Sequence, residues 1–378
     1  MKLSESLHAA LEQRGWRLPE AARKLAAAGT SATGPIGVHG SDAALHLVQL
    51  ASSRSGVRLR ARSTVTFDEG SGSEARIASL RSALRRGRFS GRRAVAALEG
   101  SDVKLMVFDQ LGGESEAEAA AVLRLVEERF DEPVDRLVID YLPIRDLDEG
   151  QERHSALVAV AHEDVVIERL EGLRSAGLQV DALEIAPTAT RRLVSALGSR
   201  GREENAMVLY AGHRRGHLIV LWGRRLVLYR ELEFGADEVE ERVAKALELD
   251  PGEAAEMMRR HGVAPPAPGE ASSVSAASYE VAETIGEILK PSFYQLADQL
   301  ERARIYTASR ARGAAPDRAY LLGGFACWPG ADRLLASLGP LPVHTLDPAA
   351  TLGFEAPEAD GEAAVAAGLA LRGVLDDG

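Results

Sequence analysis

The chain has 378 residues, a length that suggests two or three domains. Of these residues 46% are hydrophobic and 27% charged, a composition typical of globular proteins. Its 45 basic and 56 acidic side chains give a net charge of −11, which argues against a general nucleic-acid-binding protein. A single cysteine, Cys327, excludes an internal disulfide and a thiolate zinc cluster, and we interpret it as a buried structural thiol. No signal peptide and no span of ~20 apolar residues is apparent, so we expect a soluble, cytoplasmic protein.

Residues 1–34 are predicted to form a helical extension, which is either a docking helix or a poorly ordered tail. Strands and helices alternate after it. Strands are predicted at 35–39, 44–50, 57–67, 94–98, 103–108, 137–142, 156–161 and 180–185. Helices are predicted at 75–86, 114–130, 162–176 and 188–197. The alternation favours an α/β fold.

The opening pattern returns about 170 residues later, a period that no small repeat explains. Segments 37–50 and 208–221 both contain a strand, a glycine-bearing turn and a second strand, and each is followed by a third strand. Two copies of this unit imply a duplicated α/β fold whose two lobes face a cleft.

The second copy continues with further strands and helices. Strands are predicted at 206–210, 217–222, 225–232, 319–322 and from Val343, and helices at 236–249, 251–261, 279–309, 331–338 and 361–374. The segment 264–278, rich in Pro, Ser and Ala, is interpreted as a mobile surface loop. Pro291 predicts a kink or a break near Lys290 in the longest helix.

Three glycine-bearing turns, at 39–41, 211–213 and 323–325, are expected at the cleft, where backbone N–H groups could approach phosphates. Histidines near these turns would need converging carboxylates to hold a metal, and we predict no metal site. The arginine-rich segment 81–93 has two interpretations: a solvated helix face with its loop, or a surface that meets an anionic membrane.

Several longer segments carry a resemblance to a known family. They are IGVHGSDAALHLVQL, DRLVIDYLPI, ALVAVAHEDVVIERLEGLRSAGLQVDALEIAP, AMVLYAGHRRGHLIVLWGRRLVLYRELEFG, IGEILKPSFYQLADQLERAR, LLGGFACWPGADRLL and GEAAVAAGLALRG. In this order and spacing the chain resembles the PilM family of actin-like proteins of type IV pilus assembly over about residues 35–375. More distantly it resembles the division protein FtsA and the cytoplasmic part of the secretion protein GspL.

This resemblance implies a duplicated actin-like (ribonuclease H-like) fold. Lobe I would span 35–198 and include an inserted small subdomain at about 94–142. Lobe II would span 199–360, with its mobile loop at 264–278. The last segment, 361–378, would return to lobe I as a C-terminal helix.

The resemblance also implies a nucleotide site. Its cofactor-binding residues would be Gly40, Ser41, Gly212, Gly235, Glu287, Lys290, Gly323, Gly324 and Phe325. However, His39 and Tyr210 stand where the family has aspartates near the phosphates and the metal. Neither side chain supplies the carboxylate that Mg²⁺ prefers. We therefore expect a degenerate site that binds ATP or ADP weakly or not at all and catalyses no hydrolysis.

The function implied by the resemblance is a non-catalytic cytoplasmic scaffold of a type IV pilus or a related type II secretion-like inner-membrane complex. A groove beside the small subdomain would receive the short cytoplasmic tail of a PilN-like bitopic membrane protein, for example by strand addition at a sheet edge. The chain would then be peripheral at the inner membrane through this partner. A pilus motor ATPase, a platform protein and a second copy are further partners to test, and no nucleic acid is expected. The alternatives are a nucleotide-binding actin-like ATPase and an FtsA-like filament-forming protein.

Overall fold

The computed structural model describes residues 33–374 except 41–43, 54–55, 68–70, 113–114, 145–152, 199–204, 224, 234, 267–274, 312, 347, 349–362 and 373. The predicted extension, 1–34, therefore lies almost wholly outside the described residues. Two compact units divide the chain: unit 1 is Met1–Leu193 with Val365–Gly378, and unit 2 is Val194–Ala364. The end of the chain thus belongs to the same unit as its beginning.

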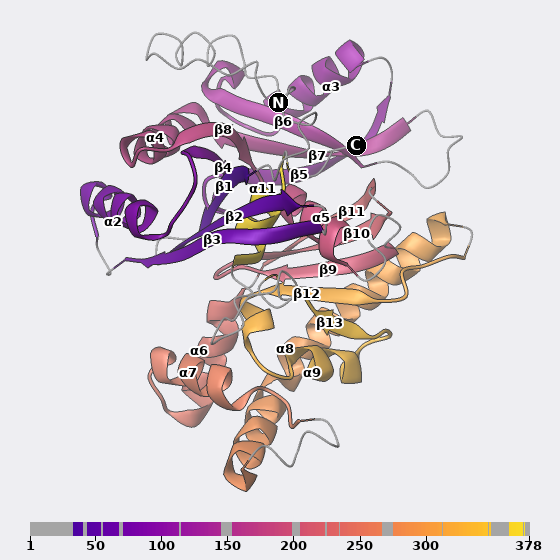
Figure 1. Cartoon of the computed structure of the whole chain (residues 1–378). Helices are drawn as coiled ribbons and strands as arrows, with labels where there is room; N and C mark the ends of the chain where they lie inside the picture. The colour runs from indigo at the N-terminus through magenta and orange to yellow at the C-terminus, as the bar shows by residue number, and fades with distance from the viewer. Residues whose placement is uncertain are drawn as a thin grey trace. The chain divides into compact units, whose positions relative to one another are not determined.

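Five strands form the large sheet of unit 1, in the order β3-β2-β1-β4-β8 (Figure 1). They are β1 (Thr33–Gly40), β2 (Ala44–Ser53), β3 (Gly56–Thr66), β4 (Arg93–Ala97) and β8 (Gln179–Glu184). The first three strands pair antiparallel, whereas β4 lies parallel to both β1 and β8. The inner strands β1 and β4 are apolar and mostly buried, as expected for strands covered on both faces.

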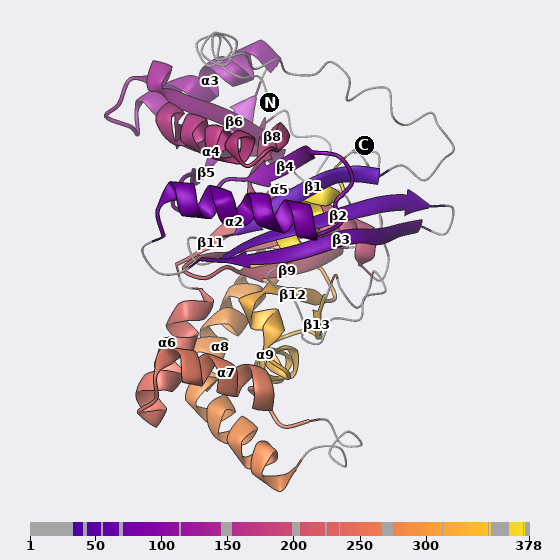
Figure 2. The ribbon, with the colours of Figure 1, turned by 60° about the vertical axis from the view of Figure 1, so that its left-hand side comes forward.

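Helices cover both faces of this sheet. On one face lie α2 (Ser73–Arg86) and α4 (Glu163–Ser175), and their leucines join Ile36 and Val38 of β1 in one hydrophobic cluster (Figure 2). On the other face lies α11 (Ala364–Ala370), whose backbone contacts Gly37 of β1. The same helix meets α5 (Ala186–Leu197), where Gly368 lies against Ala189. The predicted closing helix at 361–374 is thus shorter than expected and ends at Ala370.

A second, three-stranded sheet of unit 1 has the order β5-β7-β6 and is antiparallel throughout. Its strands are β5 (Lys104–Gly112), β6 (Leu137–Ile144) and β7 (Arg153–His162), with α3 (Ser115–Glu127) and the short η3 (Val134–Arg136) between β5 and β6. Side chains of α3 and of one sheet face form a separate hydrophobic cluster. The interval expected for the small subdomain, about 94–142, differs from this sheet because β4 pairs within the large sheet and β7 completes the small one.

Unit 2 repeats the large sheet. Its strands β9 (Asn205–Ala211), β10 (Gly216–Trp222), β11 (Arg225–Leu232), β12 (Ala319–Gly323) and β13 (Val343–Thr345) have the order β11-β10-β9-β12-β13. The pairing senses match those of unit 1, with two antiparallel hairpin pairs followed by two parallel pairs. The predicted duplication is therefore confirmed.

The described helices of unit 2 are α6 (Ala236–Leu247), α7 (Pro251–His261), α8 (Ala276–Arg310), η6 (Gly324–Cys327) and α9 (Ala331–Leu338). Their bounds correct two predictions. The helix α8 continues through Pro291, so the alternative of a break was wrong: Pro291 lacks an N–H, but the flanking turns hold the helix. The predicted loop 264–278 is also too long, because Ser275 caps α8 by accepting a hydrogen bond from the backbone N–H of Ser278.

The contact between β1 and α11 is close enough to require glycine. A Cβ atom at residue 37 would lie 1.9 Å from the carbonyl oxygen of Ala366. Gly37→Ala would force β1 and α11 apart, so we expect the free energy of unfolding to fall by about 1–3 kcal/mol. In the matched variant Gly172→Ala, nothing lies within 4 Å of the added Cβ, and we expect helix α4 to gain up to ~1 kcal/mol. Urea unfolding monitored by circular dichroism measures both, and equal changes would contradict this packing.

Candidate functional site

A groove of about 300 Å³ is lined by edge strands of both sheets of unit 1. Strand β6 is the edge of the small sheet and pairs only with β7, and β8 is the edge of the large sheet and pairs only with β4, within the described residues. An edge strand carries backbone N–H and C=O groups that its own sheet does not use. The groove therefore brings together two edge strands with which an extended peptide could pair through backbone hydrogen bonds.

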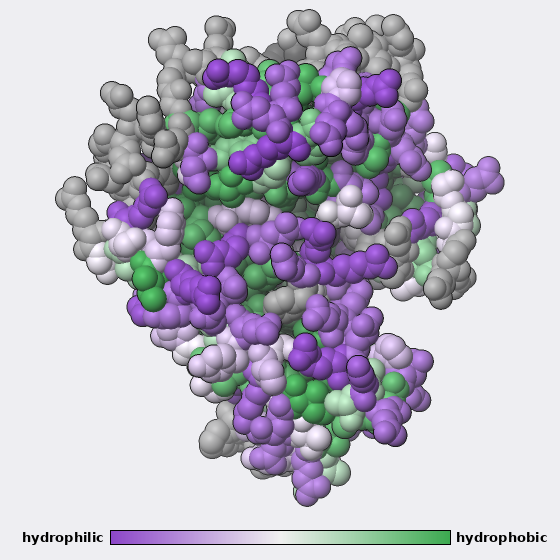
Figure 3. All heavy atoms as spheres, turned by 180° about the vertical axis from the view of Figure 1, so that it is seen from behind, coloured by the Kyte–Doolittle hydropathy of each residue, from purple (hydrophilic) through white to green (hydrophobic). Residues whose placement is uncertain are grey.

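The walls of the groove are mostly apolar. Those side chains are Leu98, Val103, Val138, Leu142, Leu157, Ala159, Ala161, Val166, Ala182, Leu183 and Ile185. Hydrophobic residues are also visible between hydrophilic ones on the face of unit 1 drawn in Figure 3. The polar lining is confined to a few groups, namely Asp140, Tyr141, Glu184, Thr188, Arg191, Arg192 and Arg372. Such a lining suits a ligand with aliphatic side chains and a few polar groups that fix its position.

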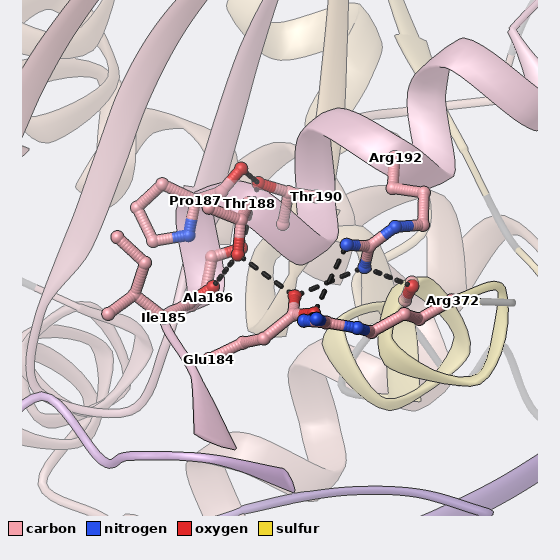
Figure 4. Close-up of polar contacts among 9 residues, drawn as sticks. Glu184, Ile185, Ala186, Pro187, Thr188, Thr190, Arg192 and Arg372 are labelled. Carbon is pink, nitrogen blue, oxygen red and sulfur yellow. Dashed lines mark hydrogen bonds and ion pairs between the residues drawn. The ribbon is translucent and has the colours of Figure 1, made fainter. Parts of the chain in front are cut away.

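Glu184, at the end of β8, is the centre of the polar lining (Figure 4). Its side chain is 6% exposed. The guanidinium of Arg192 on α5 donates to both carboxylate oxygens, at 3.1 Å each, and the hydroxyl of Thr188 donates to Oε2 at 3.1 Å. Arg372, which follows α11, donates to Oε1. One carboxylate thus accepts hydrogen bonds from two separate parts of the chain.

This cluster also fixes the end of the chain against α5. Arg192 Nη1 donates to the carbonyl oxygen of Gly368 in α11, at 3.0 Å, as well as to Glu184. Burial alone would raise the pKa of Glu184, but the positive charges and hydrogen bonds of Arg192 and Arg372 outweigh it, so the pKa lies below its usual value. Glu184 therefore remains ionised at neutral pH and balances part of the positive charge in the groove.

In unit 2, four of the predicted nucleotide-site glycines lie close together. A Cβ at Gly235 would lie 2.1 Å from the carbonyl oxygen of His213, and one at Gly323 would lie 2.0 Å from that of Ala211. A Cβ at Gly324 would lie 2.6 Å from Cβ of Ala236. The structure thus brings the β9–β10 turn with Gly212, the start of α6 and the end of β12 into backbone contact.

Three backbone amides of these turns already have protein acceptors. The N–H of Ala236 donates to the carbonyl of Gly212 at 2.9 Å, and the N–H of Asp237 donates to that of His213 at 3.0 Å. The N–H of Gly212 itself donates to the carbonyl of Arg215. A phosphate bound here would have to compete with these bonds for the same donors.

The other predicted nucleotide-site residues have varied positions. Gly40 ends β1 in unit 1, and Ser41 lies outside the described residues. Glu287 and Lys290 form an exposed ion pair with each other on α8. The ring of Phe325 is fully buried and packs against Phe293 of α8 and Trp328, so its side chain serves the core of unit 2. Nucleotide contact by these residues stays a prediction.

The two positions that lack the family's aspartates are paired with histidines in the hairpins. His39 lies opposite His46, and Tyr210 lies opposite His217. The rings of Tyr210 and His217 stack with their centroids 4.9 Å apart, and burial lowers the pKa of His217 to about 3, so it is neutral. Among the described residues, no three His, Cys, Asp or Glu side chains form a group that could hold a metal. Cys327 is partly buried.

Sequence reasoning missed the groove residues. Glu184 ends β8 and Arg192 follows eight residues later on α5, but Arg372 is separated from Glu184 by 188 residues. The only sequence signal was the position of β8 immediately before a helix, which does not identify the partner of its carboxylate. To predict the groove, one must know how the strands of both sheets are ordered and paired. The pattern of apolar residues does not give this information.

Known proteins are similar to this chain over most of its length. The sequence profile of a family described as type IV pilus assembly protein PilM matches residues 37–374. A solved structure of the PilM-PilN type IV pilus biogenesis complex is 25% identical, with a TM-score of 0.70, and the alignment covers 92% of this chain and 100% of that one. The ethanolamine utilization protein EutJ from Carboxydothermus hydrogenoformans is 12% identical, with a TM-score of 0.53 and 90% and 89% coverage, a likeness of fold alone. No curated protein sequence matches significantly. The predicted actin-like fold is confirmed.

The Glu184 cluster makes a testable contribution to stability. Glu184→Gln leaves two guanidinium groups without their anion, and we expect the free energy of unfolding at neutral pH to fall by about 2–4 kcal/mol, less than for a fully buried pair because Arg372 is 43% exposed. Because folding lowers the pKa of Glu184, its contribution is complete above about pH 4.5 and decreases as the pH falls through the folded-state pKa. The difference between wild type and variant should therefore shrink in acid.

The matched control for this prediction is Glu301→Gln. Glu301 forms a partly exposed ion pair with Arg304 within α8, so its loss should cost less than about 1 kcal/mol. Urea unfolding of both variants across acidic and neutral pH makes the comparison. An equal cost for the two substitutions would contradict the structural role of Glu184.

Proposed function

Because the chain belongs to the PilM family of type IV pilus assembly proteins, we propose that it is a non-catalytic scaffold of a type IV pilus or related inner-membrane assembly complex. Its partner is the short cytoplasmic tail of a PilN-like membrane protein. The similar solved structure is itself a PilM-PilN complex, which supports this partner. The observation that carries the proposal is the groove of unit 1, because it offers an extended peptide two sheet edges and apolar walls.

The groove suits the chemistry of an extended tail. Backbone hydrogen bonds to β6 or β8 would supply affinity without regard to sequence, and alternate side chains of the tail would enter the apolar walls. At the polar end, Asp140 supplies oxygen acceptors and Arg191 and Arg372 supply guanidinium groups, whereas Glu184 and Arg192 bond to each other. A polar residue of the tail bound there would fix the register of the peptide.

Attachment through a partner agrees with the helices of the chain. None of the helices in the described part of the chain is both long and apolar enough to cross a membrane. In the proposal, the PilN-like protein spans the inner membrane and its tail holds the scaffold at the cytoplasmic face. Subunits that meet the scaffold would thereby be placed beside the membrane-bound part of the machine.

We further propose that the nucleotide site of the fold is degenerate in this chain. His39 and Tyr210 supply no carboxylate for Mg²⁺. The amides of Gly212, Ala236 and Asp237 are used within unit 2, which supports the same conclusion. Phosphoryl transfer in an ATPase or kinase needs a metal and a polarised nucleophile. The alternative, a nucleotide-dependent ATPase or filament, would need Mg²⁺-binding carboxylates that neither His39 nor Tyr210 supplies.

The groove proposal is tested by titrating the full chain with a synthetic peptide of the host's PilN-like cytoplasmic tail. We expect saturable binding, and we expect Ala159→Phe to weaken it by about tenfold or more, because the added ring would fill the groove. Ala182→Phe, which enters from β8, should act in the same way. The matched control is Ala277→Phe on the exposed first turn of α8.

Unfolding curves of all three variants separate lost binding from lost folding. A folded Ala159→Phe variant that binds as well as wild type would assign the tail to another surface. Absence of binding by wild type would remove the tail as a partner. Because the two groove variants change opposite walls, concordant losses in both would identify the groove rather than one strand.

Nucleotide binding is tested by calorimetric titration with ATP, with and without Mg²⁺, and by phosphate release. We expect affinity no stronger than about millimolar, no effect of Mg²⁺ and no release above the background of the buffer. A hydrolysing actin-like protein assayed in parallel is the positive control. Micromolar binding that requires Mg²⁺ would refute the degenerate site and favour the ATPase alternative.

A further inference from the structure

One stretch of this acidic chain is strongly basic. Residues 44–98 contain eleven arginines, no lysine and three carboxylates, in a chain whose net charge is −11. The stretch includes β2, β3, α2 and the loop that leads to β4. Neither the groove nor the glycine turns use these arginines. Such a separation of charge points to a surface that meets an anionic partner.

The fold brings some of these arginines to one end of the large sheet, where β3 begins, α2 ends and the loop leads into β4. Gln49 of β2 is buried and pairs with the backbone of Ser90: its Nε2 donates to the carbonyl oxygen at 2.7 Å, and its Oε1 accepts from the N–H at 2.8 Å. This tie holds the loop with Arg88 and Arg92 against the sheet. Gln49 also lies opposite Ala61 of β3, next to Arg60.

We name this surface the arginine face and define it by six residues from these segments. They are Arg58, Arg60, Arg85, Arg86, Arg88 and Arg92, all of them exposed. Within the described residues, no carboxylate lies within ion-pair distance of any of the six. On unit 2, by contrast, Arg242 pairs with Glu238 and Arg302 pairs with Asp298. The arginine face thus carries positive charge that forms no ion pair within the described part of the chain.

A polar hollow of about 430 Å³ adjoins this face between β3 and α2. Ser79, Ser82 and Arg86 of α2 supply its polar side chains beside Val65, Ala78 and Ala83, whereas the hydroxyl of Thr64 contacts Nδ1 of His46 at 3.3 Å. Arg86 Nη1 donates to the hydroxyl of Ser82 at 2.8 Å, which directs the guanidinium along α2. Hydroxyl donors beside a guanidinium are the groups that bind a phosphodiester oxygen.

We propose that the arginine face binds the surface of a membrane rich in anionic phospholipid, with a headgroup phosphate in the polar hollow. Several exposed arginines without acidic partners are attracted to the negative potential of an anionic leaflet, and their contributions add. The acidic remainder of the chain disfavours wrapping by a nucleic acid, whereas a membrane meets one face only. This contact is made by the chain itself and is independent of the tail in the groove.

The test is co-sedimentation of the full chain with vesicles of phosphatidylcholine alone or with a third of phosphatidylglycerol. We expect binding only to the anionic vesicles, reversed by raised salt because the contact is electrostatic. The variant Arg58→Gln, Arg85→Gln, Arg92→Gln removes one arginine from each segment of the face, and we expect it to reduce the bound fraction about fivefold or more.

The matched control removes the same charge from unit 2, as Arg242→Gln, Arg260→Gln, Arg302→Gln, and should retain wild-type binding. Equal losses in both triple variants, or no preference for anionic vesicles, would overturn the proposal. Saturable binding of free glycerol phosphate without vesicle sedimentation would also overturn it, as would binding of a labelled RNA alone. Ala159→Phe should leave vesicle binding unchanged, so failure of the groove proposal and failure of this one are distinguishable.

Discussion

The carboxylate of Glu184 holds together the part of the molecule from which the proposed function follows. It ends the edge strand of the large sheet, accepts from Arg192 on the next helix, and accepts from Arg372 near the end of the chain. Without this anion, two guanidinium groups would face each other beside a groove. Hydrogen bonds from Arg192, Arg372 and Thr188 offset the cost of burying the Glu184 charge. These bonds fix the residues after α11 as part of the groove wall.

This arrangement explains why the C-terminal segment belongs to unit 1. The helix α11 can approach β1 and α5 only through Gly37 and Gly368, where a Cβ would collide with the facing backbone. Close backbone packing excludes water from the contact but does not by itself fix the orientation of α11. The ion-pair cluster fixes this orientation, because the guanidinium of Arg192 donates both to Glu184 and to the carbonyl oxygen of Gly368. Packing and electrostatics therefore place the same wall of the groove.

Sequence patterns predicted the fold but did not identify the residues of the groove, for one physical reason. Apolar periodicity is a local property, so it located most strands and helices, and the repetition of a strand–turn–strand unit revealed the duplication. The glycines of unit 2 are predicted to contact phosphate. Gly235 and Gly323 are also needed for packing, because a Cβ at either position would collide with the backbone of the neighbouring turn. The groove depends on which strands are edges, and on a pair of residues separated by 188 positions. Neither is encoded within a window of neighbouring residues.

Two weak contacts on one unit can act as a strong one. A tail that emerges from a membrane protein and a headgroup surface are both confined to the same membrane, so binding of either raises the effective concentration of the other. Under both proposals, the groove would need only modest affinity for a peptide, and the arginine face would need only modest affinity for lipid. Because the lipid contact weakens with salt and the apolar contacts of the groove do not, the two contributions respond to different conditions. If both proposed contacts form, the chain would stay at the membrane while each contact by itself remains reversible.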